Sequence, residues 1–116
     1  MNKKSRLEIR FKAIAKRLPK KEKFAMAEIG VLNGELSAKI LSKFNNIKKY
    51  IQVDRWCIYS AEEQAVENNS PMSYRNQKYF DSMKEENLKN IKRYKKRAKI
   101  IEMAIVTGKQ IGRAHV

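Results

Sequence analysis

Several residue types are scarce in this chain of 116 residues, and each shortage excludes a class of protein. Cys57 is the only cysteine, so no internal disulfide framework can form, and this fits a reducing compartment. His115 is the only histidine, and serine, histidine and acid form no recognisable catalytic triad. No apolar run reaches the roughly 20 residues that span a bilayer, and the charged start lacks the apolar core of a signal peptide. We therefore expect a small, single-domain, cytoplasmic protein without membrane contact.

Acidic residues are also scarce: 12 Asp and Glu stand against 27 Lys and Arg, a formal net charge of +15. The excess is local. Residues 1–23 hold 10 basic and 2 acidic residues and residues 84–99 hold 8 and 2, whereas residues 24–83 hold 7 of each. Two basic segments of this kind can bind phosphate backbones, but an AT-rich gene also produces a lysine-rich surface. We interpret the charge as a solvated surface, with nucleic-acid binding as the alternative.

The middle of the chain predicts a strand, a turn, a helix and a second strand. These are expected in turn at residues 24–29, at Gly30 and Gly34, at residues 37–44 and at residues 50–53. Such a unit forms a parallel sheet, and ligands bind at the carboxyl ends of its strands. Glu28 and Asp54 fall at those ends. We expect these two acids to act in the same site.

This stretch resembles the class I S-adenosylmethionine-dependent methyltransferases. The family's first motif is an acid, one residue, a glycine, three residues and a second glycine, which Glu28, Gly30 and Gly34 match. Its second motif is an acid that closes the next strand, matched by Asp54. Residues 53–56, Val-Asp-Arg-Trp, are similar to the Val-Asp-Pro-Trp of a branch that modifies small molecules and sugars, with Arg55 in place of the proline.

The resemblance implies S-adenosylmethionine as cofactor and a small-molecule or sugar acceptor. Glycine without a Cβ lets the turn lie against a ligand, and an acid after the second strand can accept both ribose hydroxyls. By resemblance, Asp54 binds the ribose, Glu28 lies near the methionine end, and Arg55 and Trp56 border the adenine. The full set of cofactor-binding residues that it implies is Glu28, Gly30, Val31, Gly34, Ser37, Asp54, Arg55 and Trp56.

A dinucleotide-binding domain is the nearest rival with the same architecture. Its Gly-x-Gly-x-x-Gly fingerprint needs a second glycine where this chain has Leu32, because backbone must approach a pyrophosphate there. S-adenosylmethionine has no phosphate to hold. The turn therefore suits S-adenosylmethionine better.

The flanking segments predict two amphipathic helices and a third strand. Leu7, Phe11, Ile14 and Leu18 recur at helical spacing until Pro19 ends the pattern. Residues 77–96 predict a helix, followed by a strand at residues 98–103. The apolar face of that second helix is expected to consist of Phe80, Met83, Leu88, Ile91 and Tyr94.

Residues 57–73 are polar, with a turn at residues 68–71, and we interpret them as a loop over the site. Glu62, Glu63 and Glu67 are acidic neighbours without a nearby histidine, so we interpret them as solvated surface and expect no metal site. Tyr74, Tyr79 and Tyr94 interleave with basic residues, a combination that can stack bases. Helical spacing assigns Tyr94 to the core and leaves the other two open.

The last residues carry a separate signal. Residues 111–116, Ile-Gly-Arg-Ala-His-Val, are what a widely used sequencing-library adapter encodes in one reading frame, followed by a stop codon. We expect residues 1–109 to be the amino-terminal part of a methyltransferase domain and residues 110–116 to be adapter read-through. The expected fold is α/β: a partial Rossmann-like three-layer arrangement of about three parallel strands with helices, incomplete at the carboxyl terminus. Such a fragment is expected to be inactive, and its catalytic residues cannot be named.

Overall fold

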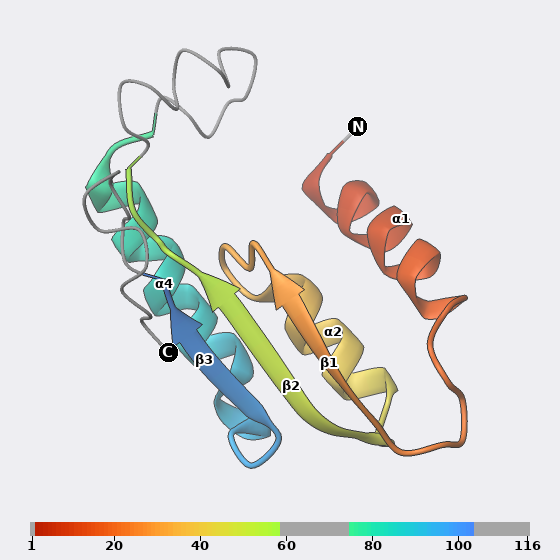
Figure 1. Cartoon of the computed structure of the whole chain (residues 1–116). Helices are drawn as coiled ribbons and strands as arrows, with labels where there is room; N and C mark the ends of the chain where they lie inside the picture. The colour runs from red at the N-terminus through yellow and green to blue at the C-terminus, as the bar shows by residue number, and fades with distance from the viewer. Residues whose placement is uncertain (1, 59–74, 104–116) are drawn as a thin grey trace, which may run out of the picture.

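The computed structural model describes residues 2–58 and 75–103. Within these ranges the chain forms three helices, a 3-10 turn and three strands (Figure 1). In chain order they are α1 (Lys3–Ala15), β1 (Phe24–Ile29), α2 (Glu35–Lys43), β2 (Ile47–Asp54), α4 (Gln77–Ile91), η2 (Lys92–Tyr94) and β3 (Ala98–Glu102). The expected loop over the site, apart from Cys57 and Ile58, and the adapter-like residues 110–116 lie outside the described residues.

The three strands form one parallel sheet in the order β1-β2-β3. Ile29 is paired with Val53, and Asp54 is paired with Glu102, so the carboxyl ends of all three strands reach the same edge. Parallel neighbours need a crossover, which α2 and α4 supply. This arrangement confirms the predicted α/β class with three parallel strands in an open sheet.

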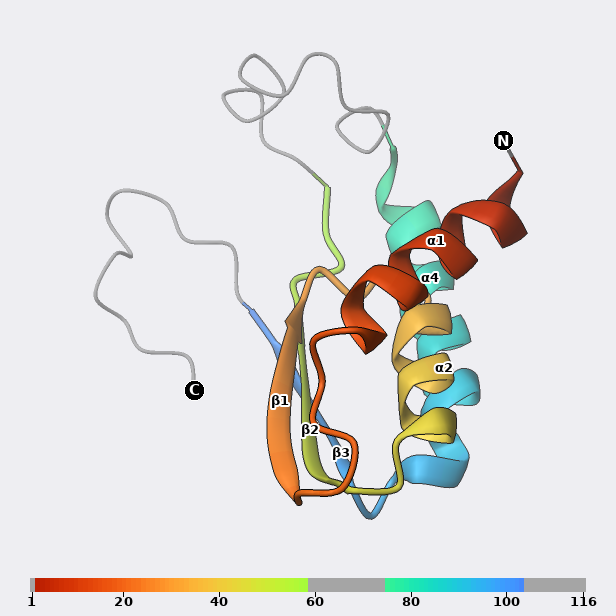
Figure 2. The same ribbon diagram turned by 90° about the vertical axis from the view of Figure 1, so that its right-hand side faces the viewer.

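All three helices lie on one side of the sheet (Figure 2). Both crossovers step in the same direction across the sheet, and right-handed crossovers of that kind place their helices on the same face. Among the described residues the other face stays uncovered, and Ile29 on it is 81% exposed. The described part of the chain therefore has two layers rather than the three that a complete doubly covered sheet has.

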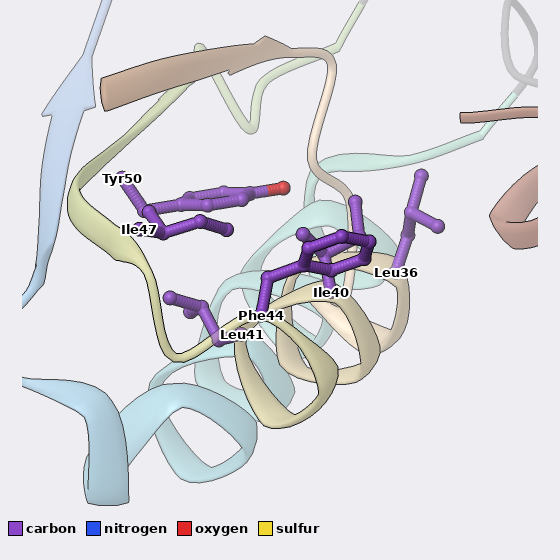
Figure 3. Close-up of a cluster of buried hydrophobic side chains, with 6 residues drawn as sticks. All are labelled: Leu36, Ile40, Leu41, Phe44, Ile47 and Tyr50. Atoms are coloured by element: carbon purple, nitrogen blue, oxygen red, sulfur yellow. The ribbon is translucent and has the colours of Figure 1, made fainter. Parts of the chain in front are cut away.

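The main core lies between α2 and the sheet. Figure 3 shows side chains of α2 gathered against Ile47 and Tyr50 of β2. Both strand residues are fully buried, as is Leu41 in the helix. The apolar residues that the sequence identified in this region pack against the cluster: Leu7, Phe11 and Ile14 in α1, and Leu18 just after it. Helix α1 therefore covers the core, and it ends at Ala15, before the predicted end at Pro19. No described helix is long and apolar enough to cross a membrane.

The predicted buried face of α4 is wrong at one residue. Phe80 and Ile91 are buried, and Tyr94 packs against the core, as expected. Leu88, however, is 48% exposed, and Asn87 beside it is fully buried. The reason is that Asn87 forms two hydrogen bonds with Gln52 of β2, so its polar side chain is satisfied in the interior.

Candidate functional site at the carboxyl edge of the sheet

The turn after β1 has an unusual backbone. Gly30 has φ +84° and Gly34 has φ +77°, the left-handed region that glycine enters without cost. Leu32 between them also has a positive φ, of 59°, which costs a residue with a side chain about 1 to 2 kcal/mol. Strain of this kind collects at functional sites, where the surrounding structure holds it in place.

The two glycines have different surroundings. A Cβ built on Gly30 would meet nothing within 4 Å, so the space beside it is open. A Cβ on Gly34 would lie 2.0 Å from Oδ1 of Asn87, a contact that no real structure tolerates. Gly30 therefore leaves room for a ligand, whereas Gly34 lets α4 approach the turn. The sequence predicted both glycines as part of the turn but did not separate these roles.

Asp54 holds the turn in place. Its Oδ2 accepts hydrogen bonds from the backbone N–H groups of Val31, at 2.7 Å, and Leu32, at 2.9 Å. Its Oδ1 accepts one from the N–H of Trp56, at 3.0 Å. A carboxylate offers about four acceptor positions. Hydrogen bonds from the described residues use three of them, which leaves one on Oδ1 for a hydroxyl group.

Trp56 lies beneath the turn and not on the surface. Its side chain is 2% exposed and packs with Val31 and Phe80. Its indole N–H donates to the carbonyl of Leu32 at 2.7 Å, and its own φ is +43°. The ring that was expected to border the adenine is therefore a support for the strained turn. Arg55, its neighbour, is half-buried.

Glu28 is a half-buried acid at the centre of a polar network. Its Oε1 accepts hydrogen bonds from the hydroxyl of Tyr50, at 2.6 Å, and from the hydroxyl of Ser37. Its Oε2 is buried and has no partner among the described residues. Burial raises the pKa of Glu28 more than these two hydrogen bonds lower it. The pKa of Tyr50 is also raised, by burial and by the negative charge of Glu28.

The network continues into the core through residues that the sequence analysis did not select. Nε2 of Gln52 donates to Oγ of Ser37 at 2.8 Å. Gln52 and Asn87 then exchange two amide hydrogen bonds, both at 2.8 Å. All three side chains are fully buried. A glutamine inside an apolar strand was the available signal, because a buried amide needs a partner from another element.

The predicted site residues are thus brought together, with a division of labour. Glu28 and Asp54 both lie at the carboxyl edge, but they do not bond to each other: Asp54 grips the turn, and Glu28 lies among the side chains beneath it. Val31 and Ser37 are buried. Among the described residues, no group of acids, cysteines or histidines is placed to hold a metal ion. Glu62, Glu63, Glu67 and Tyr74 lie outside those residues.

Most charges in the strand ends and the turns that follow them are negative, while Arg10 of α1 lies close enough to Glu28 to lower the pKa of that acid. The strand ends and the turns that follow them, residues 28–37, 52–58 and 100–103, contain four acids and one base. The acids are Glu28, Glu35, Asp54 and Glu102, and the base is Arg55. An edge of this sign attracts cations and repels phosphates.

Comparison with known proteins adds no relative: no family model matches the chain, and no curated protein or solved structure matches it significantly. The function is therefore inferred from the residues and geometry of the site.

Proposed function

We propose that the carboxyl edge of the sheet binds S-adenosylmethionine, as the cofactor site of a methyltransferase. The observation that carries the proposal is Glu28. Its carboxylate oxygen Oε2 is buried and has no hydrogen-bond partner among the described residues, and it lies close to the turn where Gly30 faces open space. A carboxylate in such a place is stabilised by a cation, which offsets the cost of burial. S-adenosylmethionine carries an ammonium and a sulfonium group, both positive.

The second element of the proposal is the ribose contact. Asp54 keeps one acceptor position after its three backbone hydrogen bonds, and it lies half-buried at the strand end. A ribose hydroxyl donating to Oδ1 would use that position. The acidic character of the edge supports the same ligand and disfavours a dinucleotide, because a pyrophosphate needs N–H donors and cations at the turn. The N–H groups of Val31 and Leu32 already donate to Asp54.

When bound, the cofactor supplies an activated methyl group for in-line transfer to a nucleophilic acceptor. The part of the work that falls to the described residues is binding and orientation, which is a large share of the rate in reactions of this kind. The resemblance of residues 53–56 points to a small molecule or sugar as acceptor. We assign no catalytic residue.

Calorimetric titration with S-adenosylmethionine tests the proposal, with Asp54→Asn as the variant. Asparagine is preferred to alanine because one carbonyl oxygen can still accept from Val31 and Leu32. We expect binding to weaken by about 1.5 to 3 kcal/mol, the usual value of a hydrogen bond to a charged group. The structure should remain folded by circular dichroism.

Glu102→Gln is the matched control, because Glu102 is the register partner of Asp54 at the end of the neighbouring strand. Its side chain forms an ion pair with Lys84 and does not touch the turn. Its affinity should equal that of the wild type. Equal affinities for folded Asp54→Asn and Glu102→Gln would exclude Asp54 from the ribose contact, and absence of binding to the wild type would refute the cofactor proposal.

The alternative function is nucleic-acid binding without enzymatic activity. Twelve basic residues lie in the segments at the opposite edge of the sheet, so nucleic-acid binding there would not compete with the cofactor for side chains. Salt dependence separates them. Phosphate binding weakens steeply as salt rises, because counterions are released, whereas the cofactor contacts proposed above involve no phosphate.

A further inference from the structure

The amino edge of the sheet, where the three strands begin, collects 12 of the 27 basic residues of the chain. Residues 20–23 precede β1, residues 43–49 join α2 to β2, and residues 92–99 join α4 to β3. Because crossover helices run antiparallel to parallel strands, all three segments meet at this edge, the lower end in Figures 1 and 2. Together they contain 12 Lys and Arg and one acid, Glu22. We call these three segments the basic rim.

Two polar clasps hold the rim together. Nδ2 of Asn46 donates to the carbonyls of Pro19, at 2.9 Å, and Glu22, at 2.8 Å, which ties the first segment to the second. Arg97 ties the third to the second: its guanidinium donates to the carbonyls of Phe44, Ile47 and Leu41 at 3.1, 3.1 and 2.8 Å. A preorganised surface loses less entropy when it binds a partner.

Stabilisation of helix ends explains only part of the positive charge in the basic rim. Cations in the last turn of a helix stabilise it through the dipole, and Lys43 and Lys92 fit that description. Lys48, Lys49 and Lys99 lie in strands, and residues 20–23 form a loop. The ion pairs found in the described residues join Lys39 to Glu8 and Lys84 to Glu102, away from the rim. Lys20 lies over the ring of Phe44 and Arg97 over the ring of Tyr94. Among the described residues, however, no ion pair neutralises the rim charges, so they repel one another unless an anion covers them.

The side chains of the rim indicate what kind of anion fits. The aromatic residues there, Phe44 and Tyr94, are buried and half-buried, so the rim offers no exposed ring on which single-stranded bases could stack. The exposed large apolar residues of the described chain are Ile9, Ile29, Ile58, Leu88 and Met103, none of them in the rim. A membrane partner would therefore find nothing to insert.

We propose that the basic rim binds the phosphate backbone of double-stranded nucleic acid, independently of base sequence. Lysines contact phosphates as point charges, and such contacts position a protein on a duplex without reading it. A surface hollow of about 480 Å³ at this edge, lined by Lys20, Lys43, Asn45 and Asn46 among others, gives a phosphate access to cations from two segments.

Fluorescence anisotropy with a labelled DNA duplex of about 20 base pairs tests the proposal at rising salt. Lys95→Glu/Lys96→Glu changes two exposed rim residues, and Lys4→Glu/Lys78→Glu makes the same change of charge at exposed positions outside the rim. We expect the rim variant to weaken binding at least tenfold and to lower the slope of log K against log salt by about two. The control should lose less than twofold.

Equal losses in the two variants would overturn the rim as the binding surface, because net charge alone would then explain the affinity. Tighter binding to a single strand of the same length, or to vesicles rich in phosphatidylserine, would overturn the duplex as the partner. A second measurement needs no variant. Acetylation of the wild type should become slower at Lys48, Lys95 and Lys96 when duplex is saturating, and unchanged at Lys4 and Lys78. Uniform protection would again refute the proposal.

Discussion

The two edges of the sheet are built from different interactions. The carboxyl edge has buried polar side chains, a backbone turn with positive φ at Leu32, and mainly negative charge. The amino edge has exposed cations held on a frame of side-chain to carbonyl hydrogen bonds from Asn46 and Arg97. The carboxyl edge needs buried polar groups and a strained backbone, and its specific shape suits a small ligand. The amino edge is a surface of like charges without such a shape, which suits a long polyanion.

The comparison also shows where each edge obtains its rigidity. At the carboxyl edge, Asp54 accepts three backbone N–H groups, so an acid orders the turn. At the amino edge, Arg97 donates to three backbone carbonyls, so a base orders the end of α2 and the start of β2. One charged residue of each sign therefore satisfies backbone groups that secondary structure leaves unpaired.

The largest effect is expected from Gly34→Ala at the carboxyl edge. The new methyl group would lie 2.0 Å from Oδ1 of Asn87 and force apart its amide pair with Gln52. Adding the strain of a positive φ, we expect the free energy of unfolding to fall by about 3 kcal/mol in urea denaturation. Gly30→Ala is the control: it carries the same strain without the contact, so it should lose about 1 kcal/mol. Equal losses would show that Asn87 does not constrain the turn.

The next effect is expected from Arg97→Met at the amino edge. Methionine keeps much of the packing but removes a donor from three carbonyls, of which that of Phe44 keeps the longer bond from the N–H of Ile47, at 3.3 Å. We expect the free energy of unfolding to fall by about 2 kcal/mol. Lys96→Met removes the same charge from an exposed neighbour and should change stability little. Binding of S-adenosylmethionine should be the same in both variants, because neither touches the carboxyl edge. A lower cofactor affinity in Arg97→Met alone would mean that the edges are coupled.

The smallest effect is a pH dependence at Glu28. Burial raises its pKa above the ordinary value of 4.5, so the folded state keeps a proton that the unfolded chain releases. The stability that this contributes is present below the ordinary value and is lost as pH rises through the folded-state pKa. Thermal unfolding from acid to neutral pH should therefore show Glu28→Gln gaining stability relative to the wild type.

Exposed Glu85→Gln on α4 provides the reference for that measurement. Its difference from the wild type should stay constant over the same pH range. A constant difference for Glu28→Gln as well would mean that the carboxylate of Glu28 is not held in a desolvated position.

Local pattern predicted much of the fold. The bounds of β1, Phe24–Ile29, agree with the apolar run that predicted it. β2 begins at Ile47, three residues before the predicted start. Lys48 and Lys49 hid this start, because two charged residues in succession are typical of a loop and here lie exposed at the sheet edge. Helix α4 begins at Gln77 as predicted and ends at Ile91, where the 3-10 turn follows.

The candidate site was predictable in place but not in detail. Strand order alone put Glu28 and Asp54 at one edge. Oδ2 of Asp54 accepts hydrogen bonds from the turn after β1. This contact depends on the path of the turn, which the spacing of residues in the sequence does not reveal. Asn87 was missed for the same reason, because an isolated asparagine in a helix looks like surface until its partner Gln52 is known. The cofactor assignment remains a prediction.

The paired amides of Gln52 and Asn87 also determine how α4 is seated. Apolar contacts alone would tolerate a displacement of α4 along its axis by one turn, because such contacts depend on volume rather than on direction. Displacement of α4 would leave the buried amides of Gln52 and Asn87 without hydrogen-bond partners, each at a cost of about 1 to 3 kcal/mol. The pair therefore acts as an alignment pin between helix and sheet. With α4 fixed in this position, Nδ2 of Asn90 donates to the carbonyl of Asn33 at 2.8 Å. The buried amide pair therefore also determines where α4 supports the turn after β1.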